Sequence, residues 1–223
     1  MQLKIHTFDL PLRHVFTISR GSVSVQSTLI VELTDGTHSG YGEATTNTYY
    51  GATLERMTEA LEALRPHLAS IDQIEPEQLW QQVAARLHEH SFAQCALDEA
   101  AHDLWGKQQG VPLTQLWGLN TADCPFSNFT IGIDTIETMI EKMHEVPDWP
   151  IYKIKLGTAG DLEIIRQLRK ATSATFRVDA NGGWTAEETI HNSHELKTLG
   201  VEFIEQPLPA DDQEGNQLVF QQS

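Results

Sequence analysis

Charged side chains follow each other closely in three short apolar stretches of the C-terminal half of the chain. Lys153 and Lys155 flank Ile154 in the first stretch, whereas Asp179 and Glu205 lie in the second and third. A strand has a side-chain period of two, so both ammonium groups lie on one face. Like charges that share a low-dielectric space ease each other's deprotonation, which is how a lysine becomes a proton acceptor near neutral pH. The lysine pair therefore predicts proton transfer.

The two carboxylates suggest a metal ion. Hard oxygen ligands that converge on one point suit Mg²⁺, which keeps coordination positions open for a substrate. An Asp at a strand end is often only the cap of the next helix. Here Thr185 and Glu188 have the spacing of a capping box, which leaves Asp179 available for another role.

Parallel strands would bring these residues together. We expect strands at 151–155, 175–181 and 201–207, with helices at 162–170 and 186–199 between them. Strands that alternate with helices favour a parallel sheet with the site at the carboxyl ends. Lys155, Asp179 and Glu205 follow one another at steps of 24 and 26 residues, as a βα repeat would place them. Each motif alone also fits a solvated strand edge or a generic βα protein.

As a set, these motifs resemble a known family. Lys153-x-Lys155, Asp179-Ala-Asn-Gly-Gly-Trp184 and Glu205-Gln-Pro together are similar to the enolase superfamily, muconate-lactonizing subgroup. The resemblance implies Mg²⁺-assisted removal of a proton next to a carboxylate, through an enolate. It implies Lys155 as the catalytic base, with Asp179 and Glu205 as metal ligands.

Within this subgroup, the segment Thr130-Ile-Gly-Ile-Asp134 is most similar to dipeptide epimerases of the Ala-Glu type. In those enzymes the matching threonine and the first lysine of the pair contact substrate, which assigns that role to Thr130 and Lys153. The resemblance therefore implies an isomerase that epimerises L-Ala-D/L-Glu type dipeptides. Muconate cycloisomerase, o-succinylbenzoate synthase and N-acylamino acid racemase, which use the same lysines and metal, are alternatives.

The N-terminal half should form a separate domain. Residues 1–44 are typical of a β-meander, and apolar periodicity predicts helices at 53–68, 76–87 and 92–109. The expected loop 16–21 between the first two strands contains Arg20, which by itself is an ordinary turn residue. The resemblance implies that Arg20 contacts the side-chain carboxylate of an acidic substrate.

The resemblance implies an α+β capping domain at residues 1–118 and a (β/α)₈ TIM-type barrel domain that begins at 126. Residues 126–223 supply only about the first four βα units, because a full barrel needs ~250 residues. The expected third metal carboxylate, the opposing lysine and the acidic pair for the substrate ammonium are absent. We therefore expect a truncated enzyme, with a catalytically inactive form as an alternative.

The composition limits which classes of partner the protein can bind. Fifteen Lys and Arg against 31 Asp and Glu give a formal charge of −16, which opposes binding to nucleic acid or anionic membranes. Cys95 and Cys124 do not suggest a disulfide framework, and no apolar run has transmembrane length, so we expect a cytoplasmic protein. We also expect a small-molecule substrate and allow for a homo-oligomer.

Overall fold

The chain divides into two compact units. The computed structural model describes residues 1–222, so Ser223, the end of the predicted polar tail, lies outside the described residues. The first unit, here the meander unit, contains Met1–Pro11 and Val25–Cys124, and the second, here the parallel-sheet unit, contains Leu12–Ser24 and the chain from Pro125 onward. The domain bounds 1–118 and 126–223 stay a prediction.

The predicted β-meander is confirmed. Its strands are β1 (Gln2–Ile18), β2 (Gly21–Thr34) and β3 (Ser39–Thr45), in the order β1-β2-β3. β2 and β3 are antiparallel, with Leu33 opposite Gly40. The predicted loop 16–21 is too long, because the turn between β1 and β2 contains only Ser19 and Arg20. β-branched residues on both sides of this turn favour extended backbone and lengthen the strands.

Helices cover the core of the meander unit. The single helix predicted at 53–68 is wrong, because the segment forms two helices with Pro66 in the first turn of the second. Proline has no N–H to donate and clashes with the preceding turn, so the first helix cannot continue through it. The helices are α1 (Leu54–Glu62), α2 (Arg65–Ala69), α3 (Pro76–Leu87), α4 (Ser91–Gln109) and α5 (Leu113–Leu116), followed by the 3₁₀ turn η1 (Thr121–Asp123).

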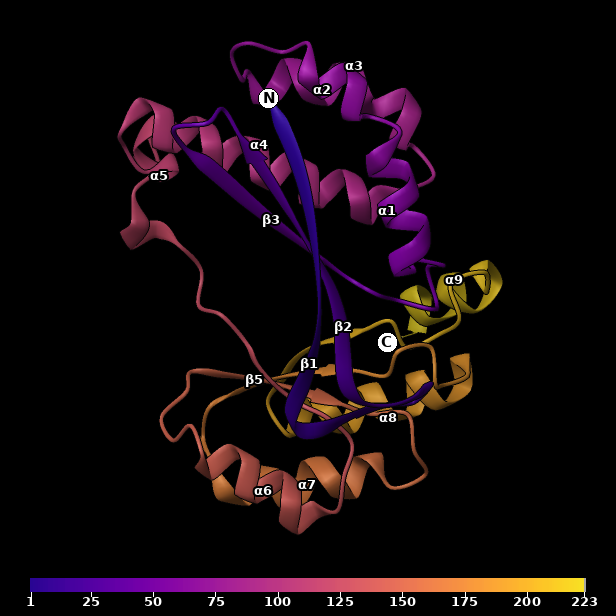
Figure 1. Cartoon of the computed structure of the whole chain (residues 1–223). Coiled ribbons are helices and arrows are strands. Elements are labelled where there is room, and N and C mark those ends of the chain that lie inside the picture. The colour runs from indigo at the N-terminus through magenta and orange to yellow at the C-terminus, as the bar shows by residue number, and fades with distance from the viewer. Residues whose placement is uncertain (223) are drawn as a thin grey trace. The chain divides into compact units, whose positions relative to one another are not determined.

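The long helix α4 lies directly along β3 (Figure 1). Two glycines of β3 make this approach possible. A Cβ added at Gly42 would lie 2.0 Å from the carbonyl oxygen of Ala96, and one added at Gly40 would lie 2.2 Å from that of Ala100. The backbone of α4 therefore contacts the backbone of β3 where a side chain would otherwise stand.

The parallel-sheet unit confirms the four predicted βα units. Four parallel strands pair in the order β4-β5-β6-β7, and each is followed by a helix (Figure 1). The strands are β4 (Phe129–Ile131), β5 (Ile151–Lys155), β6 (Thr175–Asp179) and β7 (Val201–Glu205). The helices are α6 (Ile136–His144), α7 (Asp161–Ala171), α8 (Ala186–Thr198) and α9 (Gln213–Gln222).

The two faces of this sheet differ in polarity. Ile131, Ile154, Val178 and Ile204 align across the four strands and pack in an apolar core with residues of the helices. Helices α6, α7, α8 and α9 pack against one another in sequence, as a layer over one face requires. Side chains alternate along a strand, so the opposite face receives the lysines and carboxylates.

Among residues 1–222, no helix combines the length and the apolar character that a bilayer crossing requires.

Candidate active site

Three of the predicted site residues align in register across neighbouring strands. Lys155 on β5 is opposite Asp179 on β6, which in turn is opposite Glu205 on β7. Lys155 Nζ donates a hydrogen bond to Asp179 Oδ2 at 2.7 Å. Lys155 is 8% exposed and Asp179 only 1%, so this ion pair is shielded from water. The carboxyl ends of the strands thus bring a buried amine beside a buried carboxylate, as the sequence predicted.

The ammonium of Lys153 bridges the two carboxylates. Its Nζ lies 2.6 Å from Glu205 Oε2 and 3.1 Å from Asp179 Oδ2. Lys153 and Lys155 therefore lie on the same strand face, as their spacing predicted, and both contact Asp179 Oδ2. One cation can consequently contact both carboxylates at once.

The prediction that the two lysines ease each other's deprotonation is wrong for Lys153. Burial alone would lower the pKa of Lys153, but hydrogen bonds to Glu205 and Asp179 outweigh it and raise that pKa above 10.5. Burial would raise the pKa of Asp179, yet donors from Lys155, the Asn181 amide and Lys153 hold it below its usual 3.8. The sequence pattern showed the like charges on one strand but not the carboxylates between them.

The loops after β6 and β7 have unusual backbone geometry. Asn181 has φ of 50° and Gln206 has φ of 43°, which is the left-handed region that non-glycine residues rarely adopt. The Asn181 amide thereby donates to Asp179 Oδ1 at 2.9 Å. Its side-chain Nδ2 donates to Gln206 Oε1 at 3.3 Å. This geometry holds Asp179 Oδ1 on the backbone and leaves Oδ2 for the lysines.

Arg20 lies close to this loop. The turn Ser19–Arg20 belongs to the parallel-sheet unit, and Arg20 Nη1 donates to the carbonyl oxygen of Asn181 at 2.5 Å. Ser19 Oγ donates to the same oxygen at 3.3 Å. The Phe16 ring centroid lies 6.0 Å from Lys155 Nζ. The tip of the β1–β2 hairpin therefore contacts the segment that follows Asp179.

Thr130 lies two residues before the level of Lys155 along the strands. It is in register with Lys153, which is in register with Arg177. Arg177 donates to Glu202 Oε2 at 2.5 Å and to Asn128 Oδ1 at 2.8 Å. Thr130 is thus placed beside Lys153 on the neighbouring strand, but no direct contact joins the Thr130 hydroxyl to Lys155 or the carboxylates in the described residues.

The two carboxylates fit a Mg²⁺ ion in part. Oxygen ligands from Asp179 and Glu205 are of the type that Mg²⁺ prefers, and the ammonium bridge of Lys153 shows that one cation reaches both. Within residues 1–222, no group of three or more His, Cys, Asp or Glu side chains is arranged to hold a metal. Asp179 and Glu205 therefore provide two carboxylate ligands of such a site.

Sequence reasoning missed Asp161, which is 3% exposed at the start of α7. It accepts hydrogen bonds from the loop after β5 and from the Trp184 indole, at 2.7 Å. An Asp in the first turn of a helix is common, so the sequence offers little to distinguish it. Trp184 ends the motif that begins at Asp179, and the motif alone assigns it no role.

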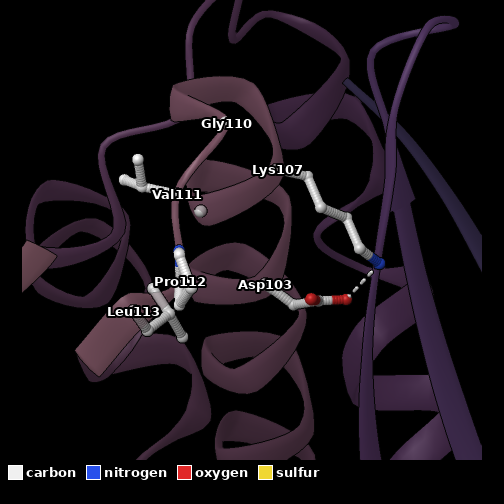
Figure 2. Close-up of a pocket in the computed structure, with 7 residues that line it drawn as sticks. Asp103, Lys107, Gly110, Val111, Pro112 and Leu113 are labelled. Carbon is white, nitrogen blue, oxygen red and sulfur yellow. Dashed lines mark hydrogen bonds and ion pairs between the residues drawn. The ribbon is translucent and has the colours of Figure 1, made fainter. Parts of the chain in front are cut away.

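A separate pocket in the meander unit lies at the end of α4 (Figure 2). Lys107 forms an ion pair with Asp103 at 2.7 Å and donates to the Ser39 carbonyl oxygen at 2.8 Å. Asp103 also accepts from the Tyr41 amide at 2.9 Å. Both charges thus fasten β3 to α4, which is a structural role.

Comparisons with known proteins agree with this architecture. Residues 2–118 match the model of the mandelate racemase / muconate lactonizing enzyme N-terminal domain, and residues 136–222 match the enolase C-terminal domain-like model. The chain is 48% identical over 223 residues to an L-Ala-D/L-amino acid epimerase of Flavobacterium johnsoniae, with all of this chain and 66% of that protein covered. It is 35% identical to the L-Ala-D/L-Glu epimerase of Bacteroides thetaiotaomicron, covering 100% of this chain and 58% of that protein.

Solved structures show the same similarity. The substrate-liganded L-Ala-D/L-Glu epimerase of Bacillus subtilis aligns with a TM-score of 0.90 at 25% identity, over 100% of this chain and 65% of that one. A dipeptide epimerase of Enterococcus faecalis, complexed with Mg and L-Leu-L-Tyr, aligns with a TM-score of 0.86 at 27% identity, over 100% and 65%. The chain thus spans 58–66% of the length of these relatives. Its sequence, its two units and its aligned strand ends together show that it belongs to the mandelate racemase / muconate lactonizing enzyme family of the enolase superfamily.

Proposed function

We propose that this chain carries the capping unit and the first catalytic half of a Mg²⁺-dependent dipeptide epimerase that acts on L-Ala-D/L-Glu type substrates. The observation that carries the proposal is the aligned set Lys155, Asp179 and Glu205 on three neighbouring strands. The similarity to epimerases of dipeptides supports the substrate class. The activity is 1,1-proton transfer at the α-carbon next to the substrate carboxylate.

Asp179 and Glu205 would hold the metal ion through their carboxylate oxygens. A bound Mg²⁺ would neutralise the negative charge that grows on the substrate carboxylate as the α-proton leaves. The ammonium of Lys153 now lies between both carboxylates, so it must move aside when a metal binds. Once a metal has displaced it, Lys153, together with Thr130 on the adjacent strand, is available to contact the substrate.

Lys155 would remove and return the proton at its Nζ atom. It is 8% exposed, which limits competition from water. Both lysines that contact Asp179 come from β5 and therefore approach from one side. Inversion requires a proton donor on the opposite side of the α-carbon. The resemblance assigns that donor to an opposing lysine, so the step that we assign to these residues is removal and return of the proton by Lys155.

Arg20 would select an acidic side chain at the reacting position. A guanidinium offers a planar fork of donors that matches a carboxylate. Its contact with the Asn181 carbonyl brings it near the end of β6, where Asp179 lies. Replacing Arg20 by Leu should raise KM for acidic dipeptides far more than for apolar ones. Equal increases for both substrate classes would sink this assignment.

Proton exchange in D₂O tests the proposal directly. The purified chain is incubated with Mg²⁺ and L-Ala-L-Glu, and loss of the α-proton signal is followed by NMR. Lys155→Met should abolish exchange, whereas Lys142→Met should not. Lys142 is a suitable control because it is a buried lysine in an ion pair, with Asp134 at 3.0 Å. A parallel panel of muconate and N-acylamino acids tests the alternative reactions, and exchange that survives Lys155→Met would refute the role of Lys155.

A further inference from the structure

Trp184 connects the loops that follow three strands of the site. It lies five residues after Asp179, in the loop between β6 and α8, and is 5% exposed. Its main-chain amide donates to the Pro207 carbonyl oxygen at 3.0 Å, in the loop after Glu205. Its indole Nε1 donates to Asp161 Oδ2 at 2.7 Å. Asp161 in turn holds the loop that follows Lys155.

Asp161 is a buried carboxylate whose donors here are uncharged. Its Oδ2 accepts from the Gly157 amide at 2.8 Å, and its Oδ1 accepts from the Thr158 amide at 2.9 Å and the Thr158 hydroxyl at 2.7 Å. With the Trp184 indole, these donors satisfy a group that would be costly to bury unpaired. Hydrogen bonds to a charged acceptor are stronger than neutral ones, so this carboxylate is an effective fastening point.

The loop that Trp184 closes also orients Asp179. The Asn181 amide donates to Asp179 Oδ1 at 2.9 Å, and the neighbouring Gly182 amide donates to the Gln206 carbonyl oxygen at 2.7 Å. A Cβ at Gly183 would lie 2.9 Å from the Gly157 Cα, so the loops after β5 and β6 touch. Fixing Trp184 therefore fixes the left-handed turn at Asn181 whose amide holds Asp179.

We propose that Asp161 and Trp184 form a positioning pair that sets the carboxylate of Asp179 relative to Lys155. In the described residues neither member forms a hydrogen bond with Lys155, Asp179 or Glu205, so the pair acts through the two loops. Its importance for catalysis rests on the proposed function, but the positioning itself is a property of the metal-free chain. Loss of the hydrogen bond between Asp161 and Trp184 should loosen the loop at Asn181 and leave strand β6 intact.

Amide exchange of the metal-free, substrate-free chain measures this positioning. In Trp184→Phe and in Asp161→Asn, we expect the Asn181 amide to exchange about tenfold faster, while the Val178 amide inside β6 keeps its protection. The Asp179 carboxylate carbon should shift in the ¹³C spectrum of both variants. Trp149→Phe is the matched control, because the Trp149 indole also donates a hydrogen bond, to the Ser127 carbonyl oxygen at 2.8 Å, but away from these loops. It should change neither signal.

A double variant tests whether the two residues act as one unit. If they do, Trp184→Phe combined with Asp161→Asn accelerates Asn181 exchange no more than either change alone. Should Trp184→Phe fail to fold, a benzothiophene ring at position 184 keeps the bicyclic shape and removes only the N–H donor. Unchanged Asn181 exchange and an unchanged Asp179 signal, or equal acceleration throughout β6, would overturn the inference.

The outcome is separate from that of the proposed function. If the wild-type chain exchanges no dipeptide proton, its proposed activity is refuted. If the Asn181 amide nevertheless exchanges faster in the two variants, the positioning pair is supported. Where dipeptide exchange is present, the variants should lower kcat about tenfold with little change in KM, because they disturb the reacting groups rather than substrate binding. A rise in KM at constant kcat would count against positioning.

Discussion

Lys153 occupies the point from which one cation contacts both carboxylates of the site. Its ammonium lies 2.6 Å from Glu205 and 3.1 Å from Asp179. Hydrogen bonds to charged groups contribute about 1.5–3 kcal/mol, and a metal ion must replace them. Lys153→Met should therefore tighten Mg²⁺ binding by about tenfold or more. Isothermal titration calorimetry of the chain measures this, with Lys142→Met as control, and weaker binding in Lys153→Met would contradict it.

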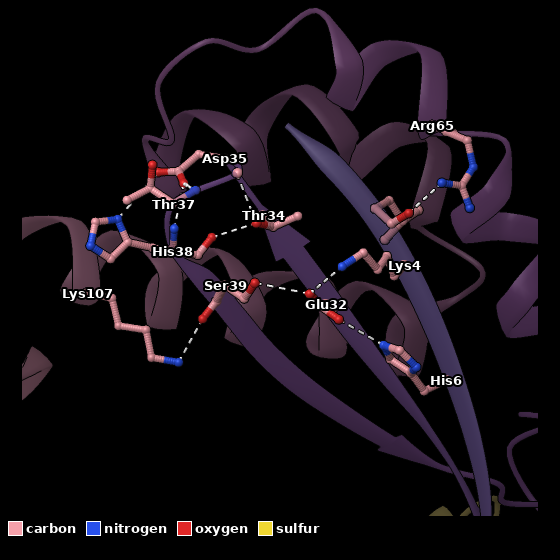
Figure 3. Close-up of polar contacts among 12 residues, drawn as sticks. Lys4, His6, Glu32, Thr34, Asp35, Thr37, His38, Ser39, Arg65 and Lys107 are labelled. Atoms are coloured by element: carbon pink, nitrogen blue, oxygen red, sulfur yellow. Dashed lines mark hydrogen bonds and ion pairs between the residues drawn. The ribbon is translucent and has the colours of Figure 1, made fainter.

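Glu32 belongs to a second polar cluster, which lies in the meander unit (Figure 3). Hydrogen bonds from Lys4 at 2.9 Å and from His6 at 3.0 Å, opposed by burial, lower its pKa from 4.5 to about 2. A lowered carboxyl pKa gives stability that is present above the unfolded pKa and lost as the pH falls toward the folded one. This contribution should therefore disappear between about pH 4.5 and 2.

Glu32→Gln tests that contribution. Urea unfolding of the wild-type chain should lose stability more steeply than Glu32→Gln as the pH falls through this window, and the variant should already be less stable at pH 7. Exposed Glu89→Gln serves as a control and should follow the wild type. Parallel acid profiles of wild type and Glu32→Gln would show that the cluster contributes no stability.

At the scale of elements, the contact between β3 and α4 depends on glycine. Gly42→Ala should destabilise the meander unit by about 2–3 kcal/mol, because the new Cβ meets backbone atoms that cannot turn aside. Gly160→Ala is the control, since its nearest contact for a Cβ is the Thr158 hydroxyl at 4.0 Å. Thermal unfolding followed by circular dichroism compares the two, and equal melting temperatures would disprove the packing argument.

The elements of the parallel sheet could be predicted well from the sequence. Buried parallel strands are short apolar runs, and the polar residue at the end of each run marks its carboxyl end. The helix at 53–68 could not be predicted correctly, since its apolar periodicity continues past Pro66. Long-range contacts could not be predicted either. Neither the hydrogen bond from Trp184 to Asp161 nor the ion pair of Lys153 with Glu205 leaves a local sequence pattern. The residue types of the site were thus predictable, but the partners of each were not.

At the scale of the whole molecule, the parallel sheet has open sides. In the part of the chain that the structure describes, β4 and β7 each pair with one neighbouring strand. β7 also has an irregular register, with Glu202 and Phe203 between the residues paired with Phe176 and Val178. Open strands offer unpaired N–H and C=O groups to other chains. The homo-oligomer expected from the sequence stays a prediction, and we expect any self-association to use the open edge of β7.

Phe203→Ser tests the role of the edge in association. Phe203 is 44% exposed in β7, so its loss should reduce concentration-dependent association, measured by light scattering after size-exclusion chromatography. Phe126→Ser is the control, because Phe126 is even more exposed, at 73%, and lies outside the sheet. Equal reductions in both variants would point to general surface hydrophobicity and not to the edge.

The tip of the β1–β2 hairpin belongs to the parallel-sheet unit although it is encoded within the first strands of the chain. On the proposed assignment, the arginine that chooses the substrate side chain is therefore inherited with the N-terminal gene segment, and the lysines that move the proton are inherited with the C-terminal one. A recombination crossover between Cys124 and Pro125 would exchange the contribution of Arg20 to substrate preference. The lysines, and with them the proposed substrate contacts of Thr130 and Lys153, would stay in place. Such a crossover would also give the C-terminal segment a hairpin tip selected in another background, so the contact of Ser19 and Arg20 with the Asn181 carbonyl becomes the point at which hybrid proteins succeed or fail.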